Sequence, residues 1–260
     1  MVRFSANLGF LWSELSLPDA IRRAHAAGFE AVEFHWPFAV PVDEVRIALA
    51  ETGLPLLGLN TRKGGSEGDF GLAALSGREE EARTAIDEAI AYAAKVNARA
   101  VHVMAGRAEE NAVAEATFAE NLAYACGAAS THRITVLIEP INHHDVPGYF
   151  LSRVEQAADL VARVGADNLK IMFDCYHVQR MQGDLLRRFV DHGAMIDHVQ
   201  IAAVPTRAEP DEGDISFERL LPVLCDNGYR GFFGAEYRPR AGTEEGLGWL
   251  DAYRAPKSNG

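Results

Sequence analysis

Short apolar runs alternate with longer amphipathic segments along the whole of this 260-residue sequence. The runs are rich in β-branched and aromatic residues and the segments between them have helical periodicity, which is typical of strand–helix units around a parallel sheet. Eight units in a chain of this length match a closed (β/α)8 TIM barrel. We therefore predict a single α/β barrel domain over residues 1–260, with strands near Phe4–Leu8, Ala31–Trp36, Pro55–Asn60, Ala100–Ala105, Ile134–Pro140, Leu169–Asp174, Ile196–Ala202 and Gly231–Tyr237.

An open, doubly wound sheet is the alternative architecture for such repeats. It usually carries a glycine-rich phosphate-binding turn after the first strand, whereas the segment ANLGFLW at residues 6–12 has one glycine. No linker, low-complexity stretch or shift in composition divides the chain. These features favour the barrel.

Local signals predict where helices begin and end. Ser76 with Glu79, and Ser152 with Glu155, have the spacing of capping boxes at helix starts. The helix after Ser76 is expected to bury its face from Ala82 to Ala93 and to expose Glu80, Arg83 and Asp87. A glycine between a helical segment and the next strand is expected to end the helix in a left-handed conformation, and this pattern occurs at Gly28, Gly53, Gly165, Gly193 and Gly228.

The overall charge restricts the classes of partner. A net charge of −12 and a pI near 5.2 disfavour binding to a phosphate backbone or to an anionic membrane surface. The first twelve residues do not resemble a secretory signal, and no apolar stretch approaches the roughly 20 residues that cross a bilayer. We therefore expect a cytoplasmic protein without nucleic-acid or membrane partners.

The three cysteines, Cys126, Cys175 and Cys225, are odd in number and form no CxxC pair. This pattern indicates neither a disulfide framework nor a zinc cluster. We expect the cysteines to act as small buried apolar side chains.

Four consecutive predicted strands close with a polar side chain. Glu139 ends ITVLIE, Asp174 ends LKIMFD, Gln200 lies in IDHVQIA and Glu236 lies in GFFGAEY. The intervals of 35, 26 and 36 residues each match about one strand–helix unit. Because the carboxyl ends of barrel strands meet at one mouth, where active sites of such barrels lie, we expect these four side chains to converge.

Three carboxylates in one buried mouth would repel each other and would be costly to desolvate. A divalent cation resolves this conflict, and a set of carboxylate and amide oxygens favours Mg²⁺ or Mn²⁺ over zinc. The alternative for any one of these acids is a buried ion pair with an arginine. The sequence therefore predicts one divalent metal held by Glu139, Asp174, Gln200 and Glu236.

Ordered motifs over nearly the whole chain carry a family resemblance. These are IEPIN with Asp145 and Pro147, FDxYHxQRMxG at residues 173–183, HVQIA, then Glu209, Pro210 and Gly213, and finally GAEYxP. Together they closely resemble the hydroxypyruvate isomerase family, which includes 2-oxo-tetronate isomerases. The resemblance implies a xylose isomerase-like barrel, one divalent metal and the interconversion of an α-hydroxy ketone with its isomeric aldehyde on a short carboxylated substrate.

The resemblance also implies roles for individual residues. It makes Glu139, Asp174, Gln200 and Glu236 the metal ligands, and it adds proton transfer to the roles of Glu139 and Glu236. His177, Arg207 and Glu209 match positions that contact substrate in related isomerases and epimerases. For Arg207 a solvated loop arginine is an equal alternative.

Two further substrate-binding candidates lie near the same predicted mouth, Asp145 and His102. Asp145 follows IEPIN within the family motif. His102 ends the fourth strand in VHVMAG, although a histidine satisfied by backbone groups is a comparable interpretation.

One segment departs from the family pattern. Family members carry a segment like NLPxGDWxxGERG after the third strand, and this chain has LNTRKGGSEGDFG. Arg62 or Lys63 is a candidate to replace the charge of the missing arginine. Residues Thr61 to Leu75 are expected to be irregular, and they form either a lid over the site or a surface loop with no role.

The predicted activity is the interconversion of hydroxypyruvate and tartronate semialdehyde, or of a 2-oxo-tetronate and its isomer, through an enediolate. A ketose 3-epimerase is the nearest alternative, although that family usually has histidine where Gln200 stands. An abasic-site endonuclease would need several zinc ions and a basic groove. A non-catalytic sugar-acid binding protein is the remaining alternative. Analogy with the family also allows a homo-oligomer.

Overall fold

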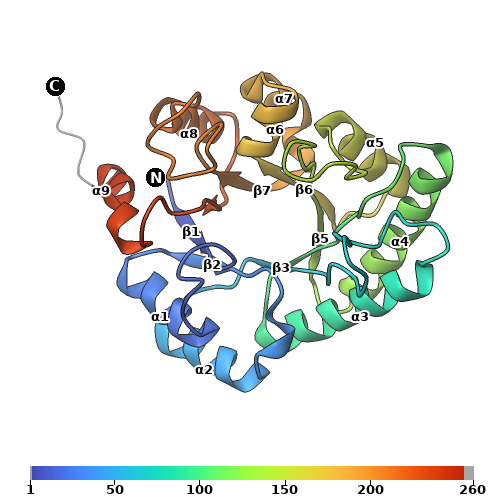
Figure 1. The fold of residues 1–260 in the computed structure, drawn as a ribbon, viewed down its shortest axis with the longest axis horizontal. Helices are drawn as coiled ribbons and strands as arrows, with labels where there is room; N and C mark the ends of the chain where they lie inside the picture. The colour runs from blue at the N-terminus through green and yellow to red at the C-terminus, as the bar shows by residue number, and fades with distance from the viewer. Residues whose placement is uncertain (1, 255–260) are drawn as a thin grey trace.

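The computed structural model describes residues 2–254, which form a ring of parallel strands enclosed by helices (Figure 1). The strands are β1 Phe4–Asn7, β2 Ala31–Glu33, β3 Gly58–Asn60, β4 Ala100–His102, β5 Thr135–Ile138, β6 Leu169–Asp174, β7 Ile196–Ile201 and β8 Phe233–Ala235. The helices are α1 Leu17–Ala26, α2 Val42–Thr52, α3 Glu79–Val96, α4 Ala112–Ser130, α5 Val154–Val164, α6 Cys175–Met181, α7 Leu185–His192, α8 Phe217–Asp226 and α9 Gly248–Arg254.

The eight strands form one sheet in the order β2-β1-β8-β7-β6-β5-β4-β3. The segments of β2 and β3 complete the ring, because Leu57 N donates to Val32 O at 2.8 Å and Phe34 N donates to Gly58 O at 2.9 Å. The predicted (β/α)8 barrel and the positions of its eight strands are confirmed, although most strands are shorter than predicted. The open sheet is thereby excluded.

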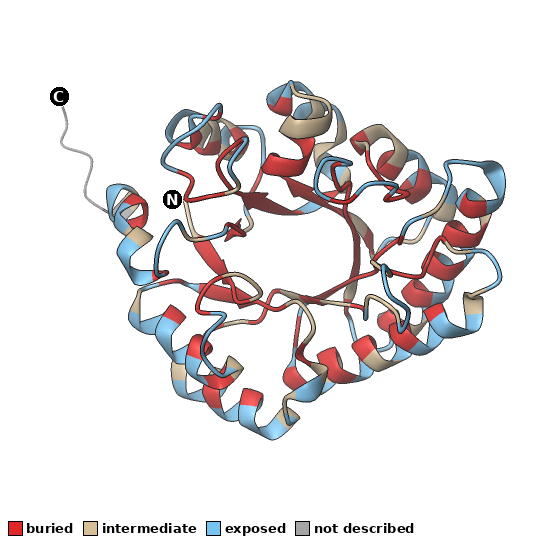
Figure 2. Cartoon of the chain, viewed as in Figure 1, coloured by how far each residue is buried: buried red, intermediate tan, exposed pale blue. Residues whose placement is uncertain are grey.

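Burial follows the layers of the barrel (Figure 2). The strands are almost wholly buried, while most of the surrounding helices bury only the face that they turn to the sheet. In α3 the predicted face from Ala82 to Ala93 is buried, and Glu80, Arg83 and Asp87 are exposed, as expected. Among residues 2–254 no helix combines the length and the apolarity needed to cross a membrane.

Four of the five predicted glycine turns are confirmed. Gly28, Gly53, Gly165 and Gly228 all have φ between 66° and 102°. The prediction for Gly193 is wrong, because this residue has φ −53° and continues in a right-handed conformation. The reason is that the chain enters a 3-10 turn over Gly193–Met195 before β7, so no left-handed stop is needed.

Both predicted capping boxes are wrong in detail. Helix α3 begins at Glu79, whose carboxylate accepts from Gly77 N at 2.9 Å instead of pairing with Ser76. Helix α5 begins at Val154, and Ser152 N donates to Gln156 at 3.1 Å instead of to Glu155. The helices start three residues after Ser76 and two residues after Ser152, so the serine hydroxyls lie outside the first helical turn.

The three cysteines are free thiols, as the sequence predicts. Cys126 and Cys175 are buried, and Cys225 is only partly buried. Burial raises the pKa of the Cys126 thiol to about 11. Cys126 is therefore a packing residue in the neutral thiol form.

Candidate metal centre and active site

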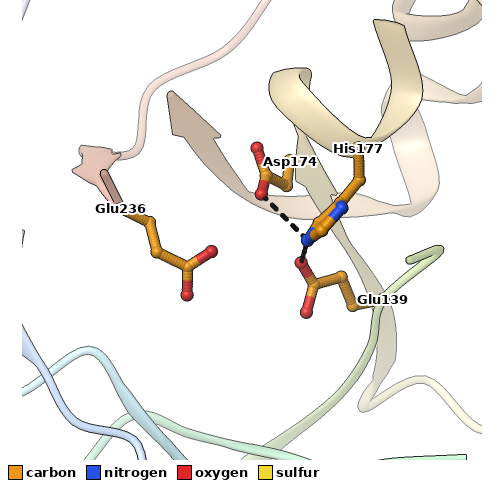
Figure 3. A group of neighbouring side chains, drawn as sticks. All are labelled: Glu139, Asp174, His177 and Glu236. Carbon is orange, nitrogen blue, oxygen red and sulfur yellow. Dashed lines mark ion pairs between the residues drawn. The ribbon is translucent and has the colours of Figure 1, made fainter. Parts of the chain in front are cut away.

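Four buried side chains from neighbouring elements converge at the carboxyl end of the barrel. Glu139 follows β5, Asp174 ends β6, His177 lies in α6 and Glu236 follows β8. Each offers one ligand atom, and these atoms all lie within 4.8 Å of one another. Figure 3 shows His177 between Asp174 and Glu139, with the carboxylate of Glu236 facing them from the other side. Three of the four predicted metal ligands are thus brought together.

The start of α6 determines which oxygen of Asp174 faces this cluster. Asp174 is the N-cap of α6, and its Oδ1 accepts a hydrogen bond from Tyr176 N at 2.8 Å. The other oxygen, Oδ2, faces the cluster at 3.5 Å from His177 Nε2. The cap therefore satisfies one oxygen and leaves the second for the site.

Gln200, the fourth predicted ligand, lies on β7 directly beside Asp174 in the sheet register. Its Nε2 donates to Glu33 at 2.8 Å, which turns Oε1 to the other side of the amide. Among the described residues, Gln200 Oε1, Glu139 Oε1 and Asp174 Oδ2 are buried acceptors without a hydrogen-bond donor. Buried oxygens of this kind on three predicted ligands fit a divalent cation with a preference for oxygen.

Nitrogen groups from three residues surround the carboxylate of Glu236. Arg207 Nη2 lies 2.8 Å from Glu236 Oε2 and 3.7 Å from Asp174 Oδ2. On the other oxygen, His35 Nε2 lies at 3.1 Å and Asn7 donates at 3.0 Å. The alternative of an acid paired with arginine thus describes Glu236. This pairing does not account for one oxygen of Glu139 and one of Asp174, which have no hydrogen-bond partner among the described residues.

The surroundings move the carboxyl pKa values in opposite directions. Burial and the neighbouring charges of Glu236 and Asp174 raise the pKa of Glu139 well above its ordinary value. Burial and Glu236 raise the pKa of Asp174 to about 8. Burial also opposes ionisation of Glu236, but the hydrogen bond to His35 and the charge of Arg207 outweigh it and lower that pKa. The protein alone therefore does not stabilise all three acids in the charged form.

His177 is oriented as a hydrogen-bond donor toward the cluster. Asn142 Oδ1 accepts from Asp145 N at 2.8 Å, so the Asn142 amide nitrogen faces His177 Nδ1 at 2.6 Å. The backbone N of Asn142 also donates to Nδ1, at 3.3 Å. Burial and the charge of Arg207 lower the pKa of His177, so the ring is neutral and its proton sits on Nε2. This N–H suits a substrate oxygen better than a metal.

His102 lies beside Glu139, with its Nδ1 3.7 Å from Glu139 Oε2. Neither ring nitrogen has a hydrogen-bond partner among the residues that the structure describes. Burial lowers the pKa of His102 to about 3, so the ring is neutral. The interpretation of a histidine satisfied by backbone groups is therefore wrong.

Arg207 and Asp145 both belong to the surroundings of the site. Arg207 Nη1 lies 3.4 Å from Asp145 Oδ2, and the hydroxyl of Tyr176 donates to the other Asp145 oxygen at 3.1 Å. The guanidinium lies over the rings of Phe10 and Tyr176, at 4.9 and 5.0 Å from their centroids. Its side chain is only 12% exposed, so Arg207 is not a solvated loop arginine.

Glu209 has a different role from the one expected. Its carboxylate is fully buried and accepts from Arg240 N at 3.1 Å, while Arg240 Nε lies 2.9 Å from its other oxygen. These contacts join the loop after β7 to the segment after β8. Both carboxylate oxygens of Glu209 therefore bind Arg240 and link the two loops. The expected contact of Glu209 with substrate is not supported.

The sequence-based prediction did not include Asn7, Glu33, His35 and His198, which are polar residues of the site. Asn7 ends β1, and Glu33 ends β2 two residues before His35, so the signal used for the last four strands was present in the first two as well. Glu33 Oε1 lies 3.0 Å from His198 Nε2, and both residues are buried. Burial opposes charge on each, but their mutual attraction lowers the pKa of Glu33 and raises that of His198.

The segment after β3 is irregular, as predicted, with one isolated bridge from Gly71 to Ala105. Arg62 forms a bidentate ion pair with Glu88 on the exposed side of α3. Lys63 instead lies over Trp36, with Nζ 4.0 Å from the ring centroid. Trp36 in turn contacts His35, which bonds Glu236. Of the two candidate cations, Lys63 is therefore the one beside the site.

Comparisons with known proteins identify the family of this chain. The family model described as xylose isomerase-like TIM barrel matches residues 21–253. A 2-oxo-tetronate isomerase from Cupriavidus necator is 45% identical over 97% of this chain and 99% of its own length. Hydroxypyruvate isomerase from Escherichia coli is 39% identical over 98% of this chain and 100% of its own.

Solved structures show the same fold. The crystal structure of AP endonuclease, family 2, from Brucella melitensis matches with a TM-score of 0.93 at 41% identity, covering 97% of this chain and 99% of that one. D-psicose 3-epimerase from Clostridium cellulolyticum matches with a TM-score of 0.79 at 16% identity, covering 99% and 93%, a likeness that concerns the fold alone. The chain belongs to the xylose isomerase-like TIM barrel family and, with full-length relatives at 39% and 45% identity, is an isomerase of the hydroxypyruvate isomerase type.

Proposed function

We propose that this isomerase depends on a divalent metal and interconverts hydroxypyruvate and tartronate semialdehyde, or a 2-oxo-tetronate and its isomer, through an enediolate. The names of the full-length relatives support the substrate class. The observation that carries the chemistry is the position of Glu139 and Glu236, which approach one buried cluster from opposite sides (Figure 3). Two carboxylates so placed can exchange a proton with adjacent carbons of one small substrate.

The metal site in this proposal consists of Glu139, Asp174, Gln200 and Glu236. Glu139, Asp174 and Gln200 each have a buried oxygen without a hydrogen-bond donor among the described residues, and such oxygens suit Mg²⁺ or Mn²⁺. When bound, such a cation supplies Lewis acidity that stabilises negative charge on the substrate oxygens.

Side chains of the protein transfer the proton and stabilise charge on the substrate. One of Glu139 and Glu236 removes a carbon-bound proton, and one returns it at the neighbouring carbon. Their different partners support this division, since Arg207 and His35 stabilise charge on Glu236 whereas Glu139 faces other acids. His177 donates a hydrogen bond from its Nε2–H to a substrate oxygen, which stabilises charge that develops there.

Lys63 is the proposed contact for the substrate carboxylate. Its partly buried ammonium lies between Trp36 and Phe70, 4.0 and 5.1 Å from the ring centroids, and no carboxylate pairs with it within residues 2–254. We expect Lys63→Met to raise KM for hydroxypyruvate about 10-fold, because a hydrogen bond to a charged group contributes roughly 1.5–3 kcal/mol. The turnover number should change little.

Steady-state kinetics test this role of Lys63. Lys95→Met, at an exposed site in the last turn of α3, is the matched control and should leave KM unchanged. An unaltered KM in Lys63→Met would mean that another residue binds the substrate carboxylate, and Arg207 is the next candidate.

The function itself is tested with purified protein stripped by a chelator and reloaded with Mg²⁺ or Mn²⁺. We expect isomerisation of hydroxypyruvate or a 2-oxo-tetronate in the reloaded protein, together with solvent deuterium at the carbon next to the carbonyl. Activity on a free ketohexose alone would indicate the 3-epimerase instead. Equal activity in the stripped and reloaded protein would contradict the proposed metal dependence.

The name of the Brucella relative calls for one more assay, the nicking of abasic duplex DNA. We expect no nicking, because the cluster holds a single histidine and the chain carries a net charge of −12. Nicking that survives removal of contaminating nucleases would overturn this expectation.

A further inference from the structure

Gln200 poses an orientation problem that a carboxylate ligand does not. A carboxylate offers an acceptor at either end, whereas an amide offers an oxygen at one end and two N–H donors at the other. If the amide were rotated by 180° about its last bond, the NH₂ group would face the cation and repel it. A metal site with a glutamine ligand therefore needs a partner that selects one of the two orientations.

Glu33 is positioned to make that selection. Its Oε2 accepts a hydrogen bond from Gln200 Nε2 at 2.8 Å, across the barrel from β2 to β7. An ionised carboxylate has no proton to donate, so it pairs only with the NH₂ end of the amide. The oxygen end, Gln200 Oε1, is left free of donors among the described residues.

Glu33 is itself held in place from two sides. Ser5 on β1 donates to its Oε1 at 2.6 Å, and His198 on β7 lies 3.0 Å from the same oxygen. These contacts occupy Oε1, and they leave Oε2 for Gln200. Three strands thus contribute to one network beside the acid cluster.

Gly234 on β8 provides the space for this network. It lies level with Gln200 and with Ser5 in the sheet register. A Cβ atom at this position would lie 2.3 Å from Glu33 Oε1 and 2.9 Å from Gln200 Cγ. No side chain fits there while Glu33 and Gln200 keep their contact.

We propose that Glu33 is a positioning residue that fixes the Gln200 amide with its oxygen toward the metal. Glu33 does not contact the metal in this arrangement and acts only through Gln200. The inference rests on the proposed function for its ligand set, but not on the substrate or the reaction. Outer partners that orient metal ligands typically change metal affinity by 10- to 100-fold when they are replaced.

The test measures Mn²⁺ binding by calorimetry on the full-length, chelator-treated protein without substrate. In Glu33→Gln the new amide keeps its oxygen for Ser5 and His198 and presents its NH₂ to Gln200. Gln200 then turns its oxygen to residue 33 and its own NH₂ to the metal. We expect the Kd for Mn²⁺ to rise at least about 10-fold.

The exchange of the two groups provides the sharper test. In the double variant Glu33→Gln, Gln200→Glu, the amide at 33 donates to one carboxylate oxygen at 200 and the other oxygen faces the metal, with the total charge unchanged. We expect this variant to bind Mn²⁺ more tightly than Glu33→Gln. It should also bind more tightly than Gln200→Glu alone, in which two carboxylates face each other at hydrogen-bond distance.

Controls separate orientation from folding. Glu30→Gln, at an exposed position just before β2, should bind Mn²⁺ as the unaltered protein does. The Tm of each metal-free variant is measured alongside, and Ser5→Ala, which removes one hold on Glu33, gives a smaller rise in Kd if Glu33→Gln does not fold. An unchanged Kd in Glu33→Gln, or a double variant no better than Glu33→Gln, would overturn the positioning role while leaving the isomerase proposal intact. Absence of Mn²⁺ binding in the unaltered protein would overturn both the ligand set and this inference.

Discussion

Glu236→Gln is expected to lower turnover about 1,000-fold and to abolish the exchange of solvent deuterium into substrate, within the range typical for loss of a general acid or base. Glutamine has nearly the same shape, and its single amide oxygen can still accept from Arg207, which lies 2.8 Å from Glu236 Oε2, while its NH₂ group takes the place of the oxygen that His35 contacts at 3.1 Å. The barrel should therefore keep its fold. What is lost is the negative charge and the ability to carry a proton.

Mass spectrometry of substrate incubated in D₂O measures the exchange, and circular dichroism checks the fold. Glu218→Gln, at an exposed position on α8, is the matched control and should exchange at the normal rate. Exchange at the normal rate in Glu236→Gln would remove Glu236 from proton transfer and leave Glu139 to act alone.

The sequence predicts most of the site because a carboxylate inside an apolar strand is a local signal. Glu139, Asp174 and Glu236 each end or follow a buried strand, and the regular spacing of strand–helix units predicts that such residues meet. The same signal in β1 and β2 would have predicted Asn7 and Glu33. The barrel brings the first two strands around to β8, so their polar ends face the same mouth.

What the sequence does not predict depends on contacts between distant residues. Glu209 appears free in the sequence, and only the fold brings Arg240, 31 residues later, onto its carboxylate. The orientation of Gln200 depends on Glu33, 167 residues earlier. The capping box at Ser76 fails for a related reason, since Arg78 pairs with Asp69 and Glu81 and becomes the N-cap of α3 itself.

The acid cluster also has a consequence for stability, because its buried carboxylates repel one another when the proposed cation is absent. Asp174 has no exposed side-chain surface and lies near Glu139 and Glu236. Burial and the charge of Glu236 raise its pKa from 3.8 to about 8. A raised pKa stabilises the fold below the unfolded value, and this stabilisation is lost as the pH rises through the folded value. The metal-free protein should therefore lose stability between about pH 4 and 8.

Asp174→Asn is expected to separate two effects on stability, the repulsion between the buried acids and the stabilisation by bound metal. The amide still caps α6 through Tyr176 N, but it carries no charge to repel Glu139 and Glu236. We expect the metal-free variant to be more stable at pH 8 by about 2 kcal/mol, roughly 4–8 °C in Tm, with a flatter dependence on pH. The same variant should bind Mn²⁺ at least about 100-fold more weakly, since it loses a ligand and not merely an outer partner.

Thermal unfolding at pH 5 and pH 8, with chelator and with saturating Mn²⁺, measures both effects. The unaltered protein should gain stability from Mn²⁺, because the ion binds only the folded state, and Asp174→Asn should gain little. Asp167→Asn, at an exposed position just before β6, should behave as the unaltered protein does. A metal-free Asp174→Asn that is less stable than the unaltered protein would mean that Arg207, 3.7 Å from Asp174, already neutralises the cluster without a cation.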